Sequence, residues 1–250
     1  KNENSVKYFE LELMDFKKQV EKFVDTKISN ENLLESIKKY NNFKTKLIEL
    51  NSLNVKGSEK LRVIQTAMLY GPSYRGKVIE FIEKNRDNQE EFSNLKDVIL
   101  TGCSIFLNDY LIDLIEQAGG NVYFFDTWIG NHYYSQIFDD EKLNSSQNPY
   151  SLLIERFKKN KLSDHSVPNF LENKIRKIEE INGKYKENNS HDLGVINHII
   201  KFCDHFSMLS SYFKEKLQKK GFQVLNLERD YSRANRGQLS TRIDAFLEML

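Results

Sequence analysis

The stretch VILTGCSIFLNDYLIDLIEQAGGNVYFFD, residues 98–126, decides the fold of this chain. A short apolar run ends at Gly102, and a second apolar run, NVYFFD, follows the glycine pair at 119–120. Between them, apolar residues recur at helical spacing: Leu107, Leu111, Ile112, Leu114 and Ile115. A strand, a helix and a second strand in this order indicate the βαβ unit of a parallel sheet.

The same order returns near the C-terminus. LGVINHI (193–199) has the composition of a buried strand, residues 206–220 form a helical pattern that Gly221 closes, and FQVLNLE (222–228) is another strand. A last helix is predicted over 238–250. Strands that alternate with helices favour an α/β fold, so we predict a Rossmann-like lobe with a parallel sheet of about four strands over residues 91–250.

The first part of the chain has a different pattern. Apolar residues at three- and four-residue steps predict helices over 5–50, with a break at ISNEN where Ser29 or Asn30 caps the second helix. Further helices are predicted over 58–69 and 74–85, and Gly71 ends the first of these. Residues 1–90 are therefore interpreted as a helical linker segment. Within the lobe, two more helices are predicted over 149–160 and 170–185.

Composition excludes several classes of function. The 37 basic side chains nearly balance the 36 acidic ones, which argues against a nucleic-acid-binding protein. No apolar stretch is long enough to span a membrane, and two cysteines cannot form a disulfide framework, so a cytoplasmic protein is expected. The chain begins with Lys1 rather than Met, and we expect it to be a portion of a longer protein.

Ligands of parallel sheets bind where strands end and helices begin. Four such loops are predicted, at 101–104, 126–130, 201–204 and 228–231, and they contain both cysteines of the chain, Cys103 and Cys203. A cysteine in this position is either a small buried hydrophobic residue or a thiolate that binds a metal. The residues alone leave both interpretations open.

Histidines suggest a zinc site that the sequence does not support. His191, His198 and His205 are seven residues apart, but a strand and two loops separate them, and the chain has no CxxC pair. Strained GxSxG elbows and glycine-rich phosphate loops are also absent.

Basic residues gather around the start of the last helix: Arg229, Arg233, Arg236 and Arg242. Gly237 permits close approach of a ligand, and the free backbone N–H groups from Gln238 onward favour an anion. The phosphates of a CoA thioester would suit this turn. A solvated basic turn without a ligand is the alternative interpretation.

Three motifs carry a resemblance to a known family. The C-terminal LERDYSRANRGQLSTRIDAFLEML (227–250), the Lys-Phe-Cys-Asp in GVINHIIKFCDHFS (194–207) and the Thr-Gly-Cys of residues 101–103 are similar, in this order, to segments of the 2-hydroxyacyl-CoA dehydratase and benzoyl-CoA reductase family. The helical opening, from Lys7 to Asn41, resembles the segment that joins the two halves of such a subunit. The pairing of Lys-Phe-Cys-Asp with Gly-Gln-Leu-x-Thr-Arg is the more specific signal.

The resemblance implies two Rossmann-like lobes that hold a [4Fe–4S] cluster between them, in a subunit that pairs with a sibling subunit. Cys203 is then a cluster ligand and Cys103 lies near the cluster. Arg233, Arg236, Gly237 and Gln238, in the basic turn described above, are expected to bind the phosphates of the acyl-CoA or to dock a partner subunit. An ATP-dependent iron–sulfur activator delivers one electron, which passes to the thioester carbonyl of a 2-hydroxyacyl-CoA, and the resulting ketyl radical expels the hydroxyl group.

The sequence also departs from this family pattern. The family's first lobe, with its other cysteines, is absent from these 250 residues, so either the chain is a fragment or the protein has lost that lobe. Ser163, Asp164 and His165 stand where many members have a Pro-Cys stretch. Because a cubane needs three or four ligands, we expect the chain alone to be catalytically inactive. The alternatives are a non-catalytic partner subunit, a related iron–sulfur reductase of the benzoyl-CoA reductase or double-cluster type, and a metal-free Rossmann-like binding module.

Overall fold

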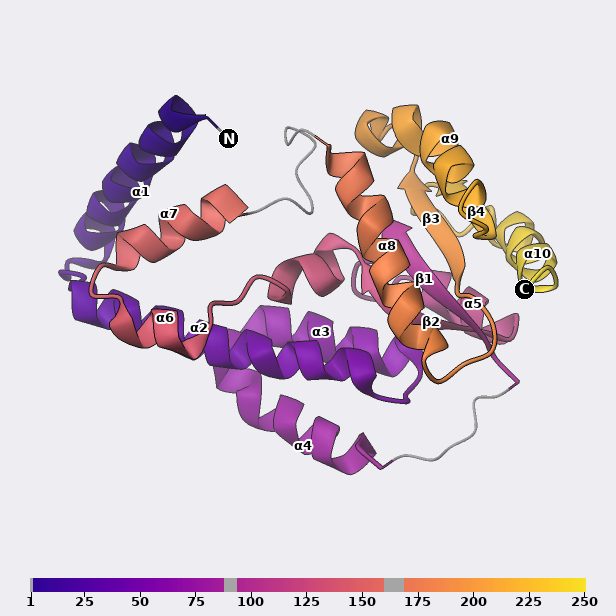
Figure 1. Ribbon diagram of the computed structural model, residues 1–250, viewed down its shortest axis with the longest axis horizontal. Coiled ribbons are helices and arrows are strands. Elements are labelled where there is room, and N and C mark those ends of the chain that lie inside the picture. The colour runs from indigo at the N-terminus through magenta and orange to yellow at the C-terminus, as the bar shows by residue number, and fades with distance from the viewer. Residues whose placement is uncertain (1, 88–93, 160–168) are drawn as a thin grey trace.

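The computed structural model of this chain describes residues 2–87, 94–159 and 169–250. Its centre is a sheet in the strand order β2-β1-β3-β4, in which every neighbouring pair is parallel (Figure 1). The strands are β1 (Lys96–Gly102), β2 (Gly120–Asp126), β3 (Gly194–Ile200) and β4 (Val224–Arg229). The predicted α/β fold with four parallel strands is confirmed.

Helices make up most of the rest of the described chain. They are α1 (Glu3–Val24), α2 (Asn30–Glu49), α3 (Gly57–Tyr70), α4 (Arg75–Asn85), α5 (Leu111–Gln117), α6 (Asp140–Ser145), α7 (Pro149–Lys159), α8 (Phe170–Lys186), α9 (Asp204–Gln218) and α10 (Arg236–Leu247), with short helical turns η1 (Leu50–Ser52), η2 (Gly71–Tyr74) and η3 (Trp128–His132). None of the helices in the described ranges is long and apolar enough to cross a membrane.

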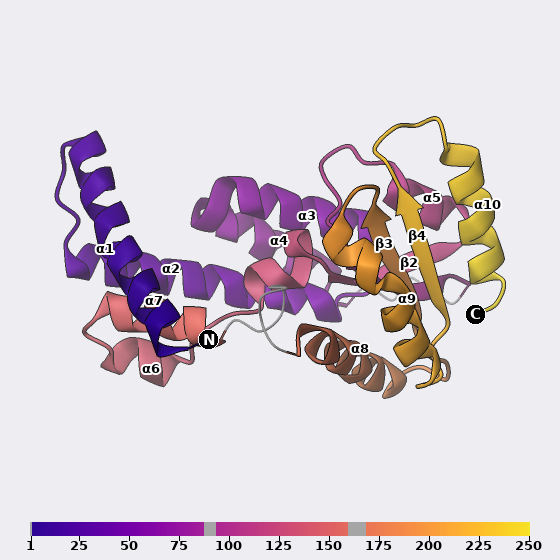
Figure 2. The same ribbon diagram turned by 90° about the horizontal axis from the view of Figure 1, so that it is seen from above.

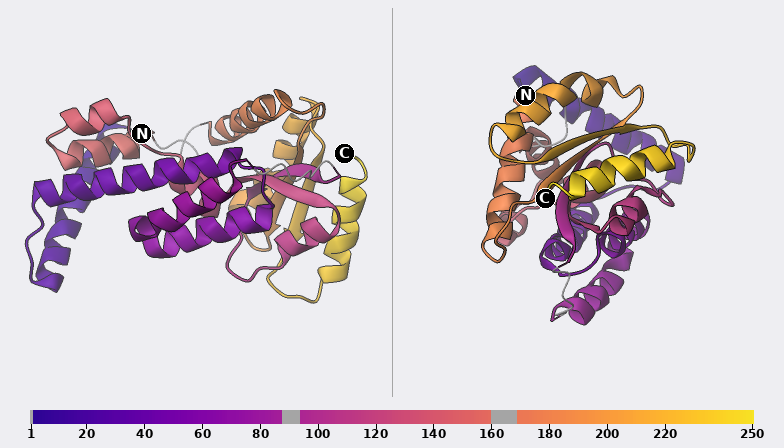
Figure 3. Two further views of the ribbon diagram at one scale, coloured as in Figure 1. Left: turned by 90° about the horizontal axis from the view of Figure 1, so that it is seen from below. Right: turned by 90° about the vertical axis from the view of Figure 1, so that its right-hand side faces the viewer.

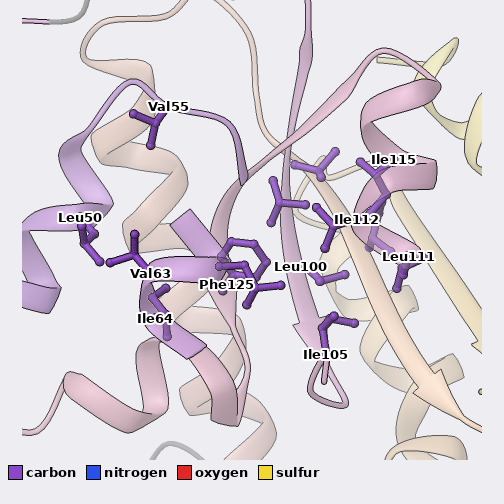
Figure 4. Close-up of a cluster of buried hydrophobic side chains, with 14 of the residues drawn as sticks. Leu50, Val55, Val63, Ile64, Leu100, Ile105, Leu111, Ile112, Ile115 and Phe125 are labelled. Carbon is purple, nitrogen blue, oxygen red and sulfur yellow. The ribbon is translucent and has the colours of Figure 1, made fainter. Parts of the chain in front are cut away.

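Helices cover both faces of the sheet (Figure 3), and a hydrophobic core lies on each face. On one face, side chains of β1 and β2 such as Leu100 and Phe125 pack against α3, α5 and α10 (Figure 4). On the other face, Ile99 and Phe124 pack against α8 and α9. Neighbouring residues of one strand point to opposite faces, so strands buried on both sides need the continuous apolar runs seen in the sequence. Burial of each large apolar side chain stabilises the fold by roughly 1.5–3 kcal/mol.

The first two helices, together with α6 and α7, form an arm that extends away from the sheet (Figure 2). The arm is held by contacts such as the stack of the Phe9 and Phe157 rings, whose centroids are 4.1 Å apart. Ser29 caps α2, as predicted, because its hydroxyl accepts a hydrogen bond from the N–H of Asn32. Helix α3, in contrast, lies on the sheet, where the Gly57 N–H donates to the side chain of Asn121.

Local differences from the predicted elements have physical reasons. The helix expected to include Leu107 begins only at Leu111, because Asn108 adopts a positive φ of 60° and the Asp109 carboxylate accepts from the Leu111 N–H in a tight turn. Leu107 is consequently exposed.

Helix α6 was not predicted, and α9 and α10 each begin two residues earlier than expected, at Asp204 and Arg236. Ser163, Asp164 and His165 lie outside the described residues.

Candidate functional site

All four strands end at the same edge of the sheet, because every strand pair is parallel. At this edge Gly102, the last residue of β1, pairs with His198 of β3. The turns that follow these two strands carry Cys103 and Cys203. The predicted meeting of both cysteines at one edge of the sheet is therefore confirmed.

The turn after β1 requires a glycine. Gly102 has φ +96°, and a Cβ atom added there would lie 2.2 Å from the carbonyl oxygen of His198. The next residue, Cys103, donates its N–H to that same carbonyl at 2.8 Å. The Thr-Gly-Cys sequence thus lets the chain pass closely over β3 and places the Cys103 side chain beside the end of this strand.

The turn after β3 is strained and exposed. Phe202 has φ +68°, which is unusual for a residue with a bulky side chain, and its side chain is 98% exposed. Cys203 follows as the residue before α9, and its carbonyl accepts from the N–H of Ser207. Cys203 therefore lies at the N-terminal end of α9, where backbone N–H groups are not yet paired within the helix.

Ile200 connects the two cysteines. Its N–H donates to the Cys103 sulfur at 3.5 Å, and its carbonyl accepts from the Cys203 N–H at 3.0 Å. Burial raises the pKa of the Cys103 thiol to about 11; the Ile200 N–H opposes this rise, and the adjacent Cys203 thiol adds to it. Cys103 is therefore protonated at neutral pH unless a metal displaces the proton. Cys203 is the more exposed of the two.

A buried histidine and arginine support this turn. Arg229 donates from Nε to Nε2 of His198 at 2.9 Å, so the other ring nitrogen, Nδ1, carries the proton and donates to the carbonyl of Cys103 at 2.9 Å. Burial, followed by the nearby Arg229 charge, lowers the pKa of His198 to about 4. A neutral imidazole thus links the end of β4 to the backbone of Cys103.

Arg229 is itself enclosed, with 1% of its surface exposed. Its Nη2 donates to the Asp109 carboxylate at 2.5 Å, and the rings of Tyr110 and Tyr231 lie 5.4 and 5.5 Å from its guanidinium carbon. Nη1 is buried and has no hydrogen-bond partner among the described residues. The network fixes the loops after β1 and β4 relative to each other, but it leaves one donor unused.

A second buried charge lies after β2. The Asp126 carboxylate accepts from the Thr101 hydroxyl at 2.7 Å and from Lys174 Nζ at 2.6 Å, and it contacts Nε2 of His132 at 2.9 Å. Burial acts to raise the pKa of Asp126, but the Lys174 ammonium and the His132 contact outweigh burial and hold this pKa well below its usual range. This cluster joins α8 to the edge of the sheet, and we interpret it as structural.

The predicted basic cluster is only partly correct. Arg233 is exposed, and Arg236 begins α10 with its guanidinium 3.2 Å from the side chain of Gln117. Gly237 and Gln238 follow, both exposed, and a Cβ atom at Gly237 would meet no atom within 4 Å. Two of the four arginines lie elsewhere: Arg229 is buried, as described above, and Arg242 donates to the carbonyl of Asn226 at 2.7 Å. The exposed turn therefore presents two arginines rather than four.

Comparison with known proteins agrees with the geometry of this edge. Residues 1–250 match the family described as 2-hydroxyglutaryl-CoA dehydratase, D-component. The chain belongs to this family. It is also similar to a protein of Escherichia coli (strain K12) named "Putative dehydratase subunit YjiM", with 24% identity over 268 residues. That alignment covers 100% of this chain and 65% of the relative, so the chain spans about two thirds of the relative's length.

Two of the histidines that suggested a zinc site have other partners. His191 lies against the hydroxyl of Tyr185, whereas His198 is bound to Arg229, so these histidines do not converge. Within residues 2–87, 94–159 and 169–250, no three side chains of the His, Cys, Asp and Glu type are grouped to hold a metal ion.

Sequence reasoning did not identify the supporting network around the cysteines. The signal available was the pair Asn197-His198, two polar residues inside a strand that is otherwise apolar and buried. Buried polar side chains need hydrogen-bond partners. The partner of His198 is Arg229, 31 positions later, and no spacing rule for a parallel sheet would have specified it.

Proposed function

We propose that this chain is part of a subunit of a [4Fe–4S] 2-hydroxyacyl-CoA dehydratase-type enzyme, which eliminates water from a 2-hydroxyacyl-CoA. One observation carries the proposal: in a chain of the dehydratase family, both cysteines lie side by side at the edge of the sheet where ligands of such folds bind. Thiolates are the usual ligands of iron–sulfur clusters.

The donor set fits a cluster in part. Cys203 is accessible at the start of α9 and would be the ligand, whereas Cys103 is 8% exposed and lies behind it. Two thiolates are fewer than the three or four that hold a cubane. The remaining ligands would come from the part of the protein that corresponds to the rest of the E. coli relative, beyond the 65% matched here.

When bound, the cluster would supply one electron for the thioester carbonyl of the substrate. The residues of this chain would hold the cluster on one side and exclude water from the reacting group. Aromatic side chains of the loops at this edge form two pairs: the ring of Phe106 lies 5.6 Å from that of Tyr231, and the ring of Trp128 lies 6.4 Å from that of Phe206. Phe106, Tyr231 and Trp128 are exposed. Such rings provide an apolar wall for an enclosed cleft once a second lobe or a sibling subunit covers this edge.

The basic turn after β4 would bind the CoA part of the substrate. Arg233 and Arg236 offer two guanidinium groups, and the N–H groups of Gly237 and Gln238 open α10 without a side-chain cap. Guanidinium groups and free backbone N–H groups both favour phosphate. The turn follows β4, the neighbour of the strand that leads to Cys203, so one acyl-CoA could extend from the phosphates to the cysteines.

The test uses the protein at its natural length, prepared without oxygen together with its sibling subunit and an ATP-dependent iron–sulfur activator. We expect this assembly to dehydrate a 2-hydroxyacyl-CoA such as 2-hydroxyglutaryl-CoA, with ATP required for the first turnovers. The 250-residue chain alone, given the same activator, iron and sulfide, should form no enoyl-CoA. Turnover by the isolated chain above a blank without enzyme would refute the proposal that the site needs ligands from outside it.

A non-catalytic partner subunit is the second candidate. It is favoured by the chain having only two cysteines, of which one is buried. The sequence that precedes residue 1 in the gene discriminates between the two. Two or more cysteines there support a catalytic subunit, and none would support a partner that assists a catalytic sibling.

A further inference from the structure

A cavity of about 480 Å³ lies beside the edge strand β2, between the end of α2, the η3 turn and α8. This volume lies within the roughly 300–1,000 Å³ that is typical of small-molecule sites. Neither cysteine and no residue of the basic turn lines the cavity. The cavity is therefore separate from the proposed cluster and CoA sites, and its role is independent of them.

Two donors in the cavity wall lack partners. Nδ2 of Asn131 and Oγ of Ser135 are buried, and neither has a hydrogen-bond partner among the described residues. Asn131 as a whole is 4% exposed. The Ser135 N–H donates to the Asn131 carbonyl, so one helical turn places both side chains on the same side. Buried polar groups without partners are rare in folded proteins, and here two adjacent ones lack an acceptor.

The charge at the cavity rim is positive. Lys177 and Lys184, two turns apart on α8, both bind the single carboxylate of Glu180, at distances of 3.1–3.2 Å. Glu49, which also lines the cavity, is neutralised by Lys46 at 2.7 Å. Among the described residues that line the cavity or pair with its lining, one ammonium charge therefore has no counter-charge, and an anion at the rim would balance it.

The rest of the wall is apolar. It is formed by Ile48 of α2, Phe124 and the ring of Tyr123 from β2, and Ile181 of α8. We propose that the cavity binds an organic carboxylate with an apolar body, such as a straight-chain carboxylic acid. Its carboxylate balances the α8 lysines and accepts from Asn131 and Ser135 after these side chains, whose donor atoms are closed to solvent in the free protein, rotate towards it. Its hydrocarbon chain lies against the isoleucine and aromatic side chains.

The test is calorimetric titration of the natural-length protein with octanoate as the probe. Octanoate should bind, and octylamine, of equal length and opposite charge, should not. Ser135→Ala and Asn131→Leu should each weaken octanoate binding about tenfold, because each removes a donor to a charged acceptor. Neither variant should lower the melting temperature of the free protein, because the donor that each variant removes has no hydrogen-bond partner in the free protein. This combination distinguishes a ligand-binding role from a structural one.

A matched pair of lysine variants tests the rim. Lys184→Gln should weaken octanoate binding, with a loss that shrinks at high salt. Lys186→Gln, on the same helix but outside the cavity and paired with Asp192, should leave the affinity unchanged. The proposal is overturned if octanoate does not bind. Equal binding of octylamine, or unchanged affinity in Ser135→Ala and Asn131→Leu, would also overturn it.

Discussion

Two regions lie at the ends of neighbouring strands of the same sheet, and they differ in burial: one is held by buried hydrogen bonds, and the other is exposed. We call them the cysteine side (Gly102, Cys103, His198, Cys203 and Arg229) and the basic turn (Arg233, Arg236, Gly237 and Gln238). In the cysteine side, a buried arginine and a neutral histidine hold the backbone of Cys103 through two hydrogen bonds of 2.9 Å. In the basic turn all four residues are exposed, and the hydrogen bond from the Arg236 guanidinium to Gln117 is exposed as well.

The difference indicates how the two regions would work. A metal ligand must be held in a fixed position before the metal binds, and buried hydrogen bonds provide this. Groups that bind the phosphates of a flexible substrate need charge and access more than rigidity. Four predictions test whether the cysteine side is as rigid, and the basic turn as free, as the structure indicates.

The largest effect is expected for Arg229→Met. This change leaves Asp109 buried and charged without its partner and removes the donor to His198. Loss of one partner of a buried ion pair costs about 3–5 kcal/mol. The variant also removes the buried Nη1 that has no hydrogen-bond partner, which offsets part of this cost. We therefore expect the free energy of unfolding to decrease by about 3 kcal/mol. Urea denaturation measures it. Arg242→Met, at an exposed arginine, is the control and should change stability by less than about 0.5 kcal/mol.

Next in size is the difference between two glycine substitutions. Gly102→Ala places a methyl group against the His198 carbonyl at positive φ and should cost about 2 kcal/mol or more. Gly237→Ala meets no atom, lies in a helix and should be neutral or stabilising by about 0.5 kcal/mol. Similar melting temperatures for the two variants would show that the Thr-Gly-Cys turn is not tightly packed.

The neutral state of His198 predicts a pH dependence of stability. The unfolded imidazole takes up a proton near pH 6.5, whereas the folded one, with its pKa lowered to about 4, does so only at lower pH. Between these values the unfolded state binds more protons, so stability falls as the pH decreases from about 6.5 to 4 and is unaffected by this group above about pH 7. We expect a loss of about 2 kcal/mol from pH 7 to pH 5. This pH-dependent loss of stability should be absent in His198→Gln. If the variant has the same pH profile of stability as the wild-type protein, His198 is not a neutral buried residue.

The smallest effect concerns ligand binding at the basic turn. Arg236→Ala should weaken binding of CoA about tenfold, equivalent to about 1.4 kcal/mol, and the loss should be larger at low salt. Because Arg236 is exposed, the melting temperature should not change. Isothermal titration with CoA measures the affinity. An unchanged affinity in a variant with altered subunit association would assign the turn to the interface with the sibling subunit.

Much of this edge was predictable from the sequence, because strand ends are marked by apolar runs and glycines. Parallel strands place Cys103 and Cys203 at one edge of the sheet, but their contact also depends on β1 and β3 being neighbours, which the sequence did not predict. The burial of Arg229 was not predictable, since an arginine in a polar sequence such as LERDYSRANR is usually exposed. Its burial depends on partners 31 and 120 positions away, which only the folded chain brings together. The unpartnered donors beside β2 were missed for the same reason.

Iron content most directly tests the central claim, that this edge of the sheet holds a cluster through Cys203. The natural-length protein, purified without oxygen, should contain about four iron and four sulfide per subunit when wild-type. Cys203→Ala should lose most of this iron and the brown absorbance, whereas Cys103→Ala should retain more of both. Full iron occupancy in Cys203→Ala would contradict the claim. It would show that Cys203 is not a cluster ligand and has only a structural role in the turn before α9.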